Sequence, residues 1–442
     1  MKKFFLTALT ITVTLMLQAC GFSRASGPVT SPGIVRPADY RVFFQKDYRL
    51  AKYEPEKGAY AGAYVLQDAY INYSMKKFNE LTGKKHAAFF RYVGYGQPFP
   101  EEWVKQVISA GAAPHIAFEP NQGLDGVKDD EYLRGFARAA ARTGVPIFLR
   151  YASEMNGAWP RYTGDPEKYI QKWRLVHDVM EEEAPNVMMV WTVFTFPQKT
   201  IPLYYPGDEY VDWVGVNIYN VVYHNNDIKQ KADHEDPLEL LNFVYDMFGD
   251  RKPIQISEYG ATHYSVTDDR DHIEFAKSKI ERMYTGLARW YPRVKAIFYF
   301  DVNNLLNAPQ GRKINNYAIT DNEEVLNTYK KVIADAHFLT EVKENREGQT
   351  VPQLFNAKDG AYVDERGNLY LSPSDLERYL PVKLVEEGKS CRVTGPGGQT
   401  LIGGLREIKI NEKSYVAADP LLAELGYRKQ IDGENKVMII AK

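Results

Sequence analysis

The sequence predicts an α/β protein in which a (β/α)8 barrel is followed by a small α+β domain. Eight short apolar runs recur between about residues 40 and 340, and they lack the polar alternation of half-exposed strands. Such runs are typical of parallel strands buried on both faces. Amphipathic helical stretches separate them, and eight βα units fit a barrel. The 442 residues also exceed one average domain, which predicts a second one.

The expected strands are residues 60–67, 86–94, 114–119, 145–154, 187–195, 211–219, 252–260 and 294–301. Among the expected helices, residues 131–144 end at a glycine, residues 166–183 begin with a proline, and residues 270–290 show the same apolar face. A doubly wound sheet is the alternative fold. It would more often carry a glycine-rich phosphate loop after its first strand, and the sequence has none there.

The N-terminus is typical of a targeting segment. Lys2 and Lys3 precede a short apolar run that ends at Ala19-Cys20. This arrangement resembles a bacterial lipobox, in which the cysteine is lipid-modified and becomes the new N-terminus; an ordinary secretory signal is the alternative. We expect residues 1–20 to be the signal peptide, residues 21–37 a Ser/Pro/Gly-rich tether, and the protein to be held by lipid at the extracellular face of the cell envelope.

The composition changes after residue 340. Residues 341–352 are charged and polar, which predicts a linker between a barrel domain at 38–340 and a second domain at 353–442. The pattern of short strands around a helix beginning at DPLLAELG resembles the copper amine oxidase N-terminal-like domain of bacterial surface proteins. The second domain contains no His, so no copper site is implied. We expect it to act as a spacer or to contact the cell envelope.

Charge and histidine content restrict the possible ligands. The net charge of −2 and the lack of a basic block argue against a nucleic-acid partner. The eight His residues form no metal-binding motif, and no cofactor or metal is expected. His224 and His263 fall in loops, where we expect them to be solvated.

Acidic residues follow four of the expected strands. They are Glu119, Glu154, Glu258 and Asp301. In a (β/α)8 barrel these positions meet at the face that carries active sites. A buried carboxylate is costly unless it is paired or used, so either catalysis or a structural ion pair, with Arg91 or Arg150, would explain each one.

The segment around Glu154 adds groups that suit a sugar. Arg150 and Asn156 can bond hydroxyls or a carboxylate, and Trp159 can stack on a pyranose face or anchor the loop. Trp191, inside an expected strand, favours core packing over sugar contact.

The motifs ASEMNG with Trp159 nearby, GVNIY and ISEYG together resemble glycoside hydrolase family 26. The resemblance covers most of residues 40–340 and implies an acid/base at Glu154 and a nucleophile at Glu258. It also implies that Tyr219, which follows Asn217 in GVNIY, bonds the nucleophile. Glu119-Pro120 resembles the Glu-Pro that closes the third strand. Many members have His before the acid/base and Trp after strand 8, where this chain has Ser153 and Phe300-Asp301.

We therefore expect a surface-anchored, retaining endo-β-glycanase acting through two Glu residues, with Glu119, Arg150, Asn156, Trp159, Trp191, Asn217, Tyr219 and Asp301 in contact with substrate. In a retaining enzyme one carboxylic acid protonates the leaving oxygen and a second carboxylate attacks the anomeric carbon. The polysaccharide stays open between mannan, β-glucan, xylan and exopolysaccharide. The alternative is a non-catalytic carbohydrate-binding lipoprotein on a degenerate barrel.

Overall fold

The computed structural model describes residues 35–345 and 348–442; the expected signal segment and Cys20 lie outside them. A parallel sheet closes on itself because its last strand pairs with its first. Its strands are β3 (Ala59–Tyr64), β4 (Ala88–Gly94), β5 (Ala113–Glu119), β6 (Ile147–Tyr151), β7 (Val187–Phe194), β8 (Trp213–Asn220), β9 (Ile254–Ala261) and β12 (Val294–Phe300). The (β/α)8 barrel is thus confirmed, and closure rules out the doubly wound alternative.

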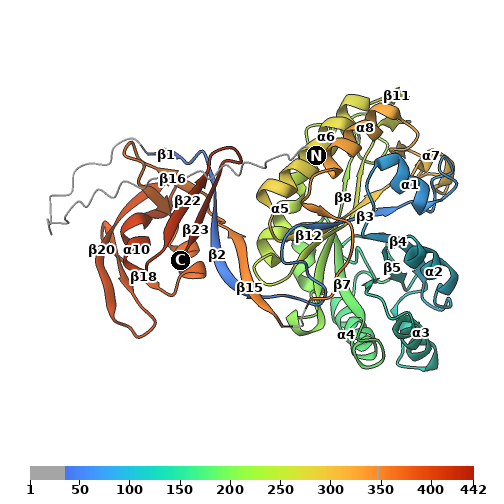
Figure 1. The fold of residues 1–442 in the computed structure, drawn as a ribbon, viewed down its shortest axis with the longest axis horizontal. Coiled ribbons are helices and arrows are strands. Elements are labelled where there is room, and N and C mark those ends of the chain that lie inside the picture. The colour runs from blue at the N-terminus through green and yellow to red at the C-terminus, as the bar shows by residue number, and fades with distance from the viewer. Residues whose placement is uncertain (1–34, 346–347) are drawn as a thin grey trace, which may run out of the picture.

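Helices cover the outside of the barrel (Figure 1). The main ones are α1 (Met75–Thr82), α2 (Glu101–Ser109), α3 (Glu131–Arg142), α4 (Pro166–Glu183), α5 (Pro237–Phe248), α6 (Ile273–Trp290) and α8 (Glu323–Ile333), with the short α7 (Asn304–Asn307) after β12. Aspartates begin several of them: Asp130 accepts a hydrogen bond from the Leu133 amide, and Asp165 accepts one from that of Lys168. Helix α6 begins at Ile273 rather than 270, because Arg270–Asp271 pair as β11 with β10 (Tyr264–Ser265).

The second domain contains two sheets and two short helices, α9 (Pro373–Tyr379) and α10 (Ala418–Glu424). The strands that follow the barrel are β15 (Thr350–Asn356), β16 (Ala361–Val363), β17 (Leu369–Leu371), β18 (Lys383–Glu387), β19 (Ser390–Thr394), β20 (Thr400–Ile410), β21 (Lys413–Ala417), β22 (Arg428–Asp432) and β23 (Val437–Ala441). Cys391 is a free, buried thiol in this domain.

Two N-terminal strands complete this domain, which corrects the expected boundaries. β1 (Arg36–Pro37), expected in the tether, pairs with β16. β2 (Arg41–Arg49), expected in the barrel domain, lies between β15 and β23 and buries Val42 and Phe44 in the second domain's core. β15 also takes up part of the expected linker. Residues 41–49 were not among the expected strands, and nothing in their local sequence shows which sheet they join.

The second domain packs against the end of the barrel where the strands begin. Asp250, just before β9, forms ion pairs with Lys358 and Arg378. The Trp290 indole donates to the carbonyl of Asn435, and the Tyr48 hydroxyl donates to that of Arg251. Figure 1 shows the two bodies side by side, with β2 and β15 running between them. The other end of the barrel, where active sites form in this fold, lies away from these contacts.

A buried polar network lies within this junction. Arg293 forms an ion pair with Glu54 at 2.5 Å, and its guanidinium lies 4.0 Å from the centre of the Tyr48 ring. Lys295 donates to Oε1 of Gln353, a residue of β15, at 2.8 Å. Burial and the neighbouring charge of Arg293 lower the pKa of Lys295 to about 7. The junction therefore contains a buried ion pair, Glu54–Arg293, and a buried lysine that is held by neutral oxygen atoms.

We expect Glu54→Ala to lower the free energy of unfolding by about 3–5 kcal/mol, because it leaves Arg293 buried without its carboxylate. Glu281→Ala, which removes the exposed partner of Lys331, is the matched control and should cost less than about 1 kcal/mol. Denaturant unfolding of both variants measures the difference. Similar costs for the two variants would contradict a structural role for the buried pair.

Candidate active site

Residues from the ends of four strands meet at the barrel mouth. Glu119 ends β5, Glu154 follows β6, Asn217 lies near the end of β8, and Glu258 lies in β9. The expected strand 145–154 is shorter in the structure and ends at Tyr151. Glu154 therefore belongs to a turn, held by its own amide, which donates to the Thr192 carbonyl at 3.0 Å.

The carboxylate of Glu258 is buried and accepts three hydrogen bonds. Arg150 Nη2 and the Tyr92 hydroxyl both donate to Oε1, each at 2.6 Å. The Tyr219 hydroxyl donates to Oε2, as the resemblance implied. The side chain is only 6% exposed. Charge-assisted bonds of this kind fix the direction of a carboxylate and stabilise its negative charge.

Arg150 is fully buried beneath this carboxylate. Its guanidinium lies 5.4 Å from the Phe90 ring centre and 5.5 Å from that of Tyr92. Burial lowers the pKa of Arg150, but the negative charges of Glu258 and Glu119 and the hydrogen bond to Glu258 outweigh it, and the pKa is raised. The guanidinium thus stays charged at the centre of the site.

Glu154 occupies an unusual backbone position. Its φ is +60°, and that of Ala152 is +45°, which side chains other than glycine seldom adopt. Such a conformation persists only where its surroundings enforce it, and it recurs at functional sites. The turn directs the Glu154 carboxyl towards Asn217.

The Glu154 carboxyl has a different environment from that of Glu258. Asn217 Nδ2 donates to Oε1 and the Trp159 indole donates to Oε2, both at 2.7 Å. Burial of the carboxyl and the negative charge of Glu258 raise the pKa of Glu154 to about 7. Asn217 also accepts from Arg150 Nη1 at 3.4 Å, so the two glutamates are connected through Asn217 and Arg150.

Glu119 supports the turn instead of facing the mouth. Its carboxylate accepts from the Ser153 hydroxyl at 2.5 Å, from the Ser153 amide at 3.1 Å and from the Tyr162 hydroxyl at 2.6 Å. Burial raises the pKa of Glu119. The expected substrate contact is therefore replaced by a positioning role next to Glu154.

Three other predicted contacts are wrong for a common reason, the direction of the side chain. Asn156 bonds both the amide and the carbonyl of Phe194, each at 2.9 Å, and ties two loops together. Trp191 packs outward against Tyr205 and Phe248 and is fully buried.

Asp301 is also fully buried, and its Oδ1 accepts from the Ile319 amide at 2.7 Å. Burial and nearby Asp68 raise its pKa well above the ordinary value. Asp301 therefore anchors the loop after β12 and does not reach the mouth.

Sequence reasoning missed Tyr92 and the neighbouring rings of Phe90, Tyr64 and Phe300, which together form an aromatic wall. Tyr92 shares the inward face of β4 with Phe90, and this alternation was the available signal. Tyr64 stacks on Phe300 at 5.3 Å, and Phe300 stands in the segment where many members of the resembled family have a tryptophan. The wall gives the mouth an apolar side facing the carboxylates.

His224 and His263 were both expected to be solvated, and His263 is not. His263 is 5% exposed, and its Nε2 lies 3.0 Å from Oδ1 of Asp321, so it is not solvated. His224 is partly exposed and lies 2.9 Å from Glu235. Within residues 35–345 and 348–442, no group of three metal-ligating side chains occurs, and no helix is long and apolar enough to cross a membrane.

Residues 131–243 match the profile of glycosyl hydrolase family 26. Endoglucanase H of Acetivibrio thermocellus is 24% identical over 62% of this chain and 30% of its own. The β-1,3-xylanase TXYA of a Vibrio species is 26% identical over 36% of this chain and 33% of its own. The chain thus spans about a third of the length of these relatives.

Among solved structures, GH26C of a Muricauda species is similar, with a TM-score of 0.48 and 13% identity over 66% of this chain and 91% of that one. The matched segment runs from α3 into α5 and includes Glu154, Asn217 and Tyr219. The profile match therefore lies on the part of the barrel that contains Glu154 and does not reach Glu258.

We expect the stability difference between Glu154→Gln and the parent protein to depend on pH. In the folded protein Glu154 keeps its proton up to about pH 7, whereas in the unfolded chain it loses it near 4.5. Raising the pH through this window favours unfolding of the parent alone, so the variant gains on the order of 3 kcal/mol relative to it. Urea unfolding at pH 4 and pH 8 measures this gain, and Glu281→Gln should show none.

Proposed function

We propose that the barrel is a retaining endo-β-glycanase in which Glu154 is the general acid/base and Glu258 the nucleophile. One observation carries the proposal: two carboxyls at the same mouth, connected through Asn217 and Arg150, have opposite environments. Arg150 and two phenols stabilise charge on Glu258, whereas burial and a negative neighbour favour the proton on Glu154. Paired carboxyls with separated proton affinities are what glycoside hydrolysis requires.

Glu154 and Glu258 would act together in two successive steps. Glu258 attacks the anomeric carbon while Glu154 protonates the leaving oxygen, and a covalent glycosyl-enzyme forms. Ester formation removes the negative charge of Glu258, which is one of the causes that hold the proton on Glu154. Glu154 then ionises more readily and accepts a proton from the attacking water. The positive charge of Arg150 remains beneath the site in both steps.

The loops after β6 and β7 support an extended glycan as the substrate. Trp159 is 47% exposed and Phe196 is 46% exposed, and exposed aromatic faces suit the apolar faces of sugars. The curated relatives are named as an endoglucanase and a β-1,3-xylanase, while the motif resemblance is to a family typified by mannan. We propose a β-linked polysaccharide drawn from β-glucan, xylan, mannan or exopolysaccharide.

The catalytic pair is tested by Glu154→Gln and Glu258→Gln on a panel of these four polysaccharides and on aryl glycosides. Glu154→Gln should lower reducing-sugar release from polysaccharide by at least about 10²-fold but spare aryl glycosides, whose leaving groups need no proton. Glu258→Gln should abolish both. The parent kcat/KM should fall above about pH 7 as Glu154 loses its proton, and this decline should be absent in Glu154→Gln on aryl glycosides.

Glu281→Gln, which changes an exposed carboxyl on the outer helix α6, is the control for replacing a carboxyl by an amide. Proton NMR of the first product should show the same anomer as the substrate, because Glu258 attacks directly. An inverted product, or near-parental activity of either glutamine variant on polysaccharide, would overturn the assignment. Glycan binding without any release of reducing sugar would instead favour a carbohydrate-binding lipoprotein.

We also propose that the protein is held at the extracellular face of the envelope by lipid on Cys20. The first described strands, β1 and β2, belong to the second domain, which packs at the end of the barrel opposite to Glu154 and Glu258. An anchor attached ahead of β1 would therefore leave the mouth directed away from the membrane. The second domain would act as a spacer or contact the envelope.

Cys20→Ser should move the protein out of the membrane fraction, as processed protein in the medium or as unprocessed precursor. Stable anchoring needs two acyl chains, and their loss removes it. Incorporation of radiolabelled fatty acid into the parent measures the modification directly, with Cys391→Ser as control. Absence of label together with full release into the medium would leave an ordinary secretory signal.

A further inference from the structure

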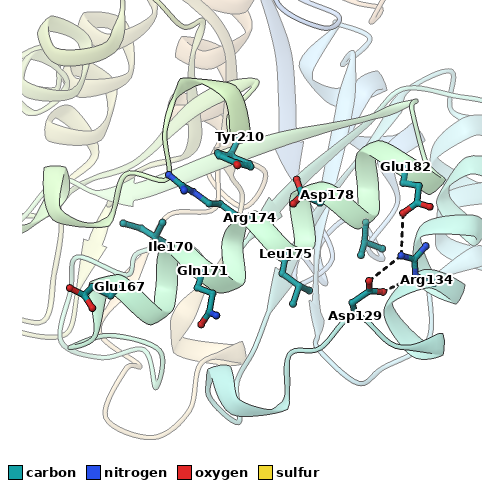
Figure 2. A pocket seen from close by; sticks show the side chains of 11 residues that line it. Asp129, Arg134, Glu167, Ile170, Gln171, Arg174, Leu175, Asp178, Glu182 and Tyr210 are labelled. Atoms are coloured by element: carbon teal, nitrogen blue, oxygen red, sulfur yellow. Dashed lines mark hydrogen bonds and ion pairs between the residues drawn. The ribbon is translucent and has the colours of Figure 1, made fainter.

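Two grooves on the barrel surface differ in how their cations are paired. Figure 2 shows the first, along the outer face of α4, where Arg134 binds Asp129 and Glu182. Arg174 in the same groove donates to the carbonyl of Pro206. Both guanidinium groups of this groove thus have partners within the protein, and they offer little to an anionic ligand.

The second groove, which we term the lateral cavity, lies between the end of β4, α2 and α3. It has a volume of about 770 Å³, within the range of small-molecule sites. Tyr92 borders it and also donates to Glu258 at 2.6 Å. The lateral cavity therefore lies beside the strand that carries Tyr92, a neighbour of the proposed nucleophile.

The lateral cavity contains a cation without a carboxylate partner. Arg91, on β4, is half-buried with its guanidinium 5.8 Å from the Trp103 ring centre. Two glutamates also line the cavity, but Glu101 pairs with Arg142 at 3.6 Å and Glu102 pairs with Lys105 at 2.6 Å. Across the described part of the chain, no carboxylate forms an ion pair with Arg91.

The walls of the lateral cavity suit a sugar ring. Phe99, Trp103 and Phe136 give apolar surface, while Gln97 and Tyr132 add polar groups at the rim. Gly135 of α3 faces open space, since a Cβ placed there would meet no atom within 4 Å. The cavity therefore depends in part on a glycine within a helix, where glycine is otherwise unfavourable.

From these observations we propose that the lateral cavity binds a carboxylate-bearing sugar unit of the glycan, with Arg91 bonding the carboxylate. A guanidinium fork matches a carboxylate geometrically, and cation–π contact with Trp103 holds the fork in place. Resting on the proposed function, this inference narrows the substrate to an acidic polysaccharide that carries uronic-acid units.

The test measures binding to the full chain of three methyl uronides, those of glucuronic, galacturonic and mannuronic acid, each against its neutral methyl glycoside. At least one uronide should bind at least about tenfold more tightly than its neutral counterpart. The neutral glycoside lacks the carboxylate, so it cannot form the charged hydrogen bond with Arg91. Arg91→Gln should reduce the ratio to near one, and Gly135→Leu should weaken uronide binding by filling the cavity. Titration calorimetry gives the ratios.

Arg138→Gln is the matched control, since it removes a charge from α3 at a position paired with Glu131 and outside the lateral cavity, and its ratio should equal that of the parent. Circular dichroism and thermal unfolding establish that each variant is folded. The inference would be overturned if the parent bound each uronide no more tightly than its neutral glycoside. It would also be overturned if Arg91→Gln kept the parent's preference for a uronide. The uronide inference is tested by binding, whereas the glycanase proposal is tested by the release of reducing sugar from the four polysaccharides. Failure of one can therefore be told apart from failure of the other.

Discussion

The buried guanidinium of Arg150 is the interaction on which the mouth of the barrel depends. Glu119, Glu154 and Glu258 lie in a region with little access to water, where unpaired negative charges would be strongly unfavourable. Arg150 binds Glu258 directly and reaches Glu154 through Asn217. One cation among three carboxyls also leaves the site short of positive charge, and burial together with the negative charge of Glu258 favours a proton on Glu154.

Glu154 and Glu258 have different chemistry because Arg150 bonds Glu258 directly and does not bond Glu154. Glu258 receives the charged bond, and its remaining positions are filled by phenols. Glu154 receives only neutral donors and sits on a left-handed turn that needs external support. Glu119 supplies this support by binding Ser153, the residue before Glu154, so a third acid serves the site without contacting substrate. The left-handed turn at Glu154 and the raised pKa of its carboxyl thus occur together at the same residue.

Sequence patterns predicted the barrel well because eight short apolar runs alternate with amphipathic helices, and the strand-end rule then selected Glu154 and Glu258 as candidates. They failed where side-chain direction or partner choice decided the outcome. Trp191 and Asp301 lie on or after the correct strands but point into packed regions. The pairing of β2 with β15 and β23 joins segments some 300 residues apart or more, and nothing local to β2 specifies it.

The two ends of the barrel are stabilised in different ways, and this separates folding from function. At the end facing the second domain, Glu54 and Arg293 form a buried ion pair. At the mouth, charges are incompletely matched, with the proton on Glu154 compensating in one place and Arg91 left without a carboxylate in another. Groups left unmatched by a fold are available to a ligand, because binding can supply the partner that the protein lacks. The incomplete pairing at the mouth and beside it is therefore the physical basis on which we propose substrate recognition there, whereas the buried Glu54–Arg293 pair stabilises the junction with the second domain.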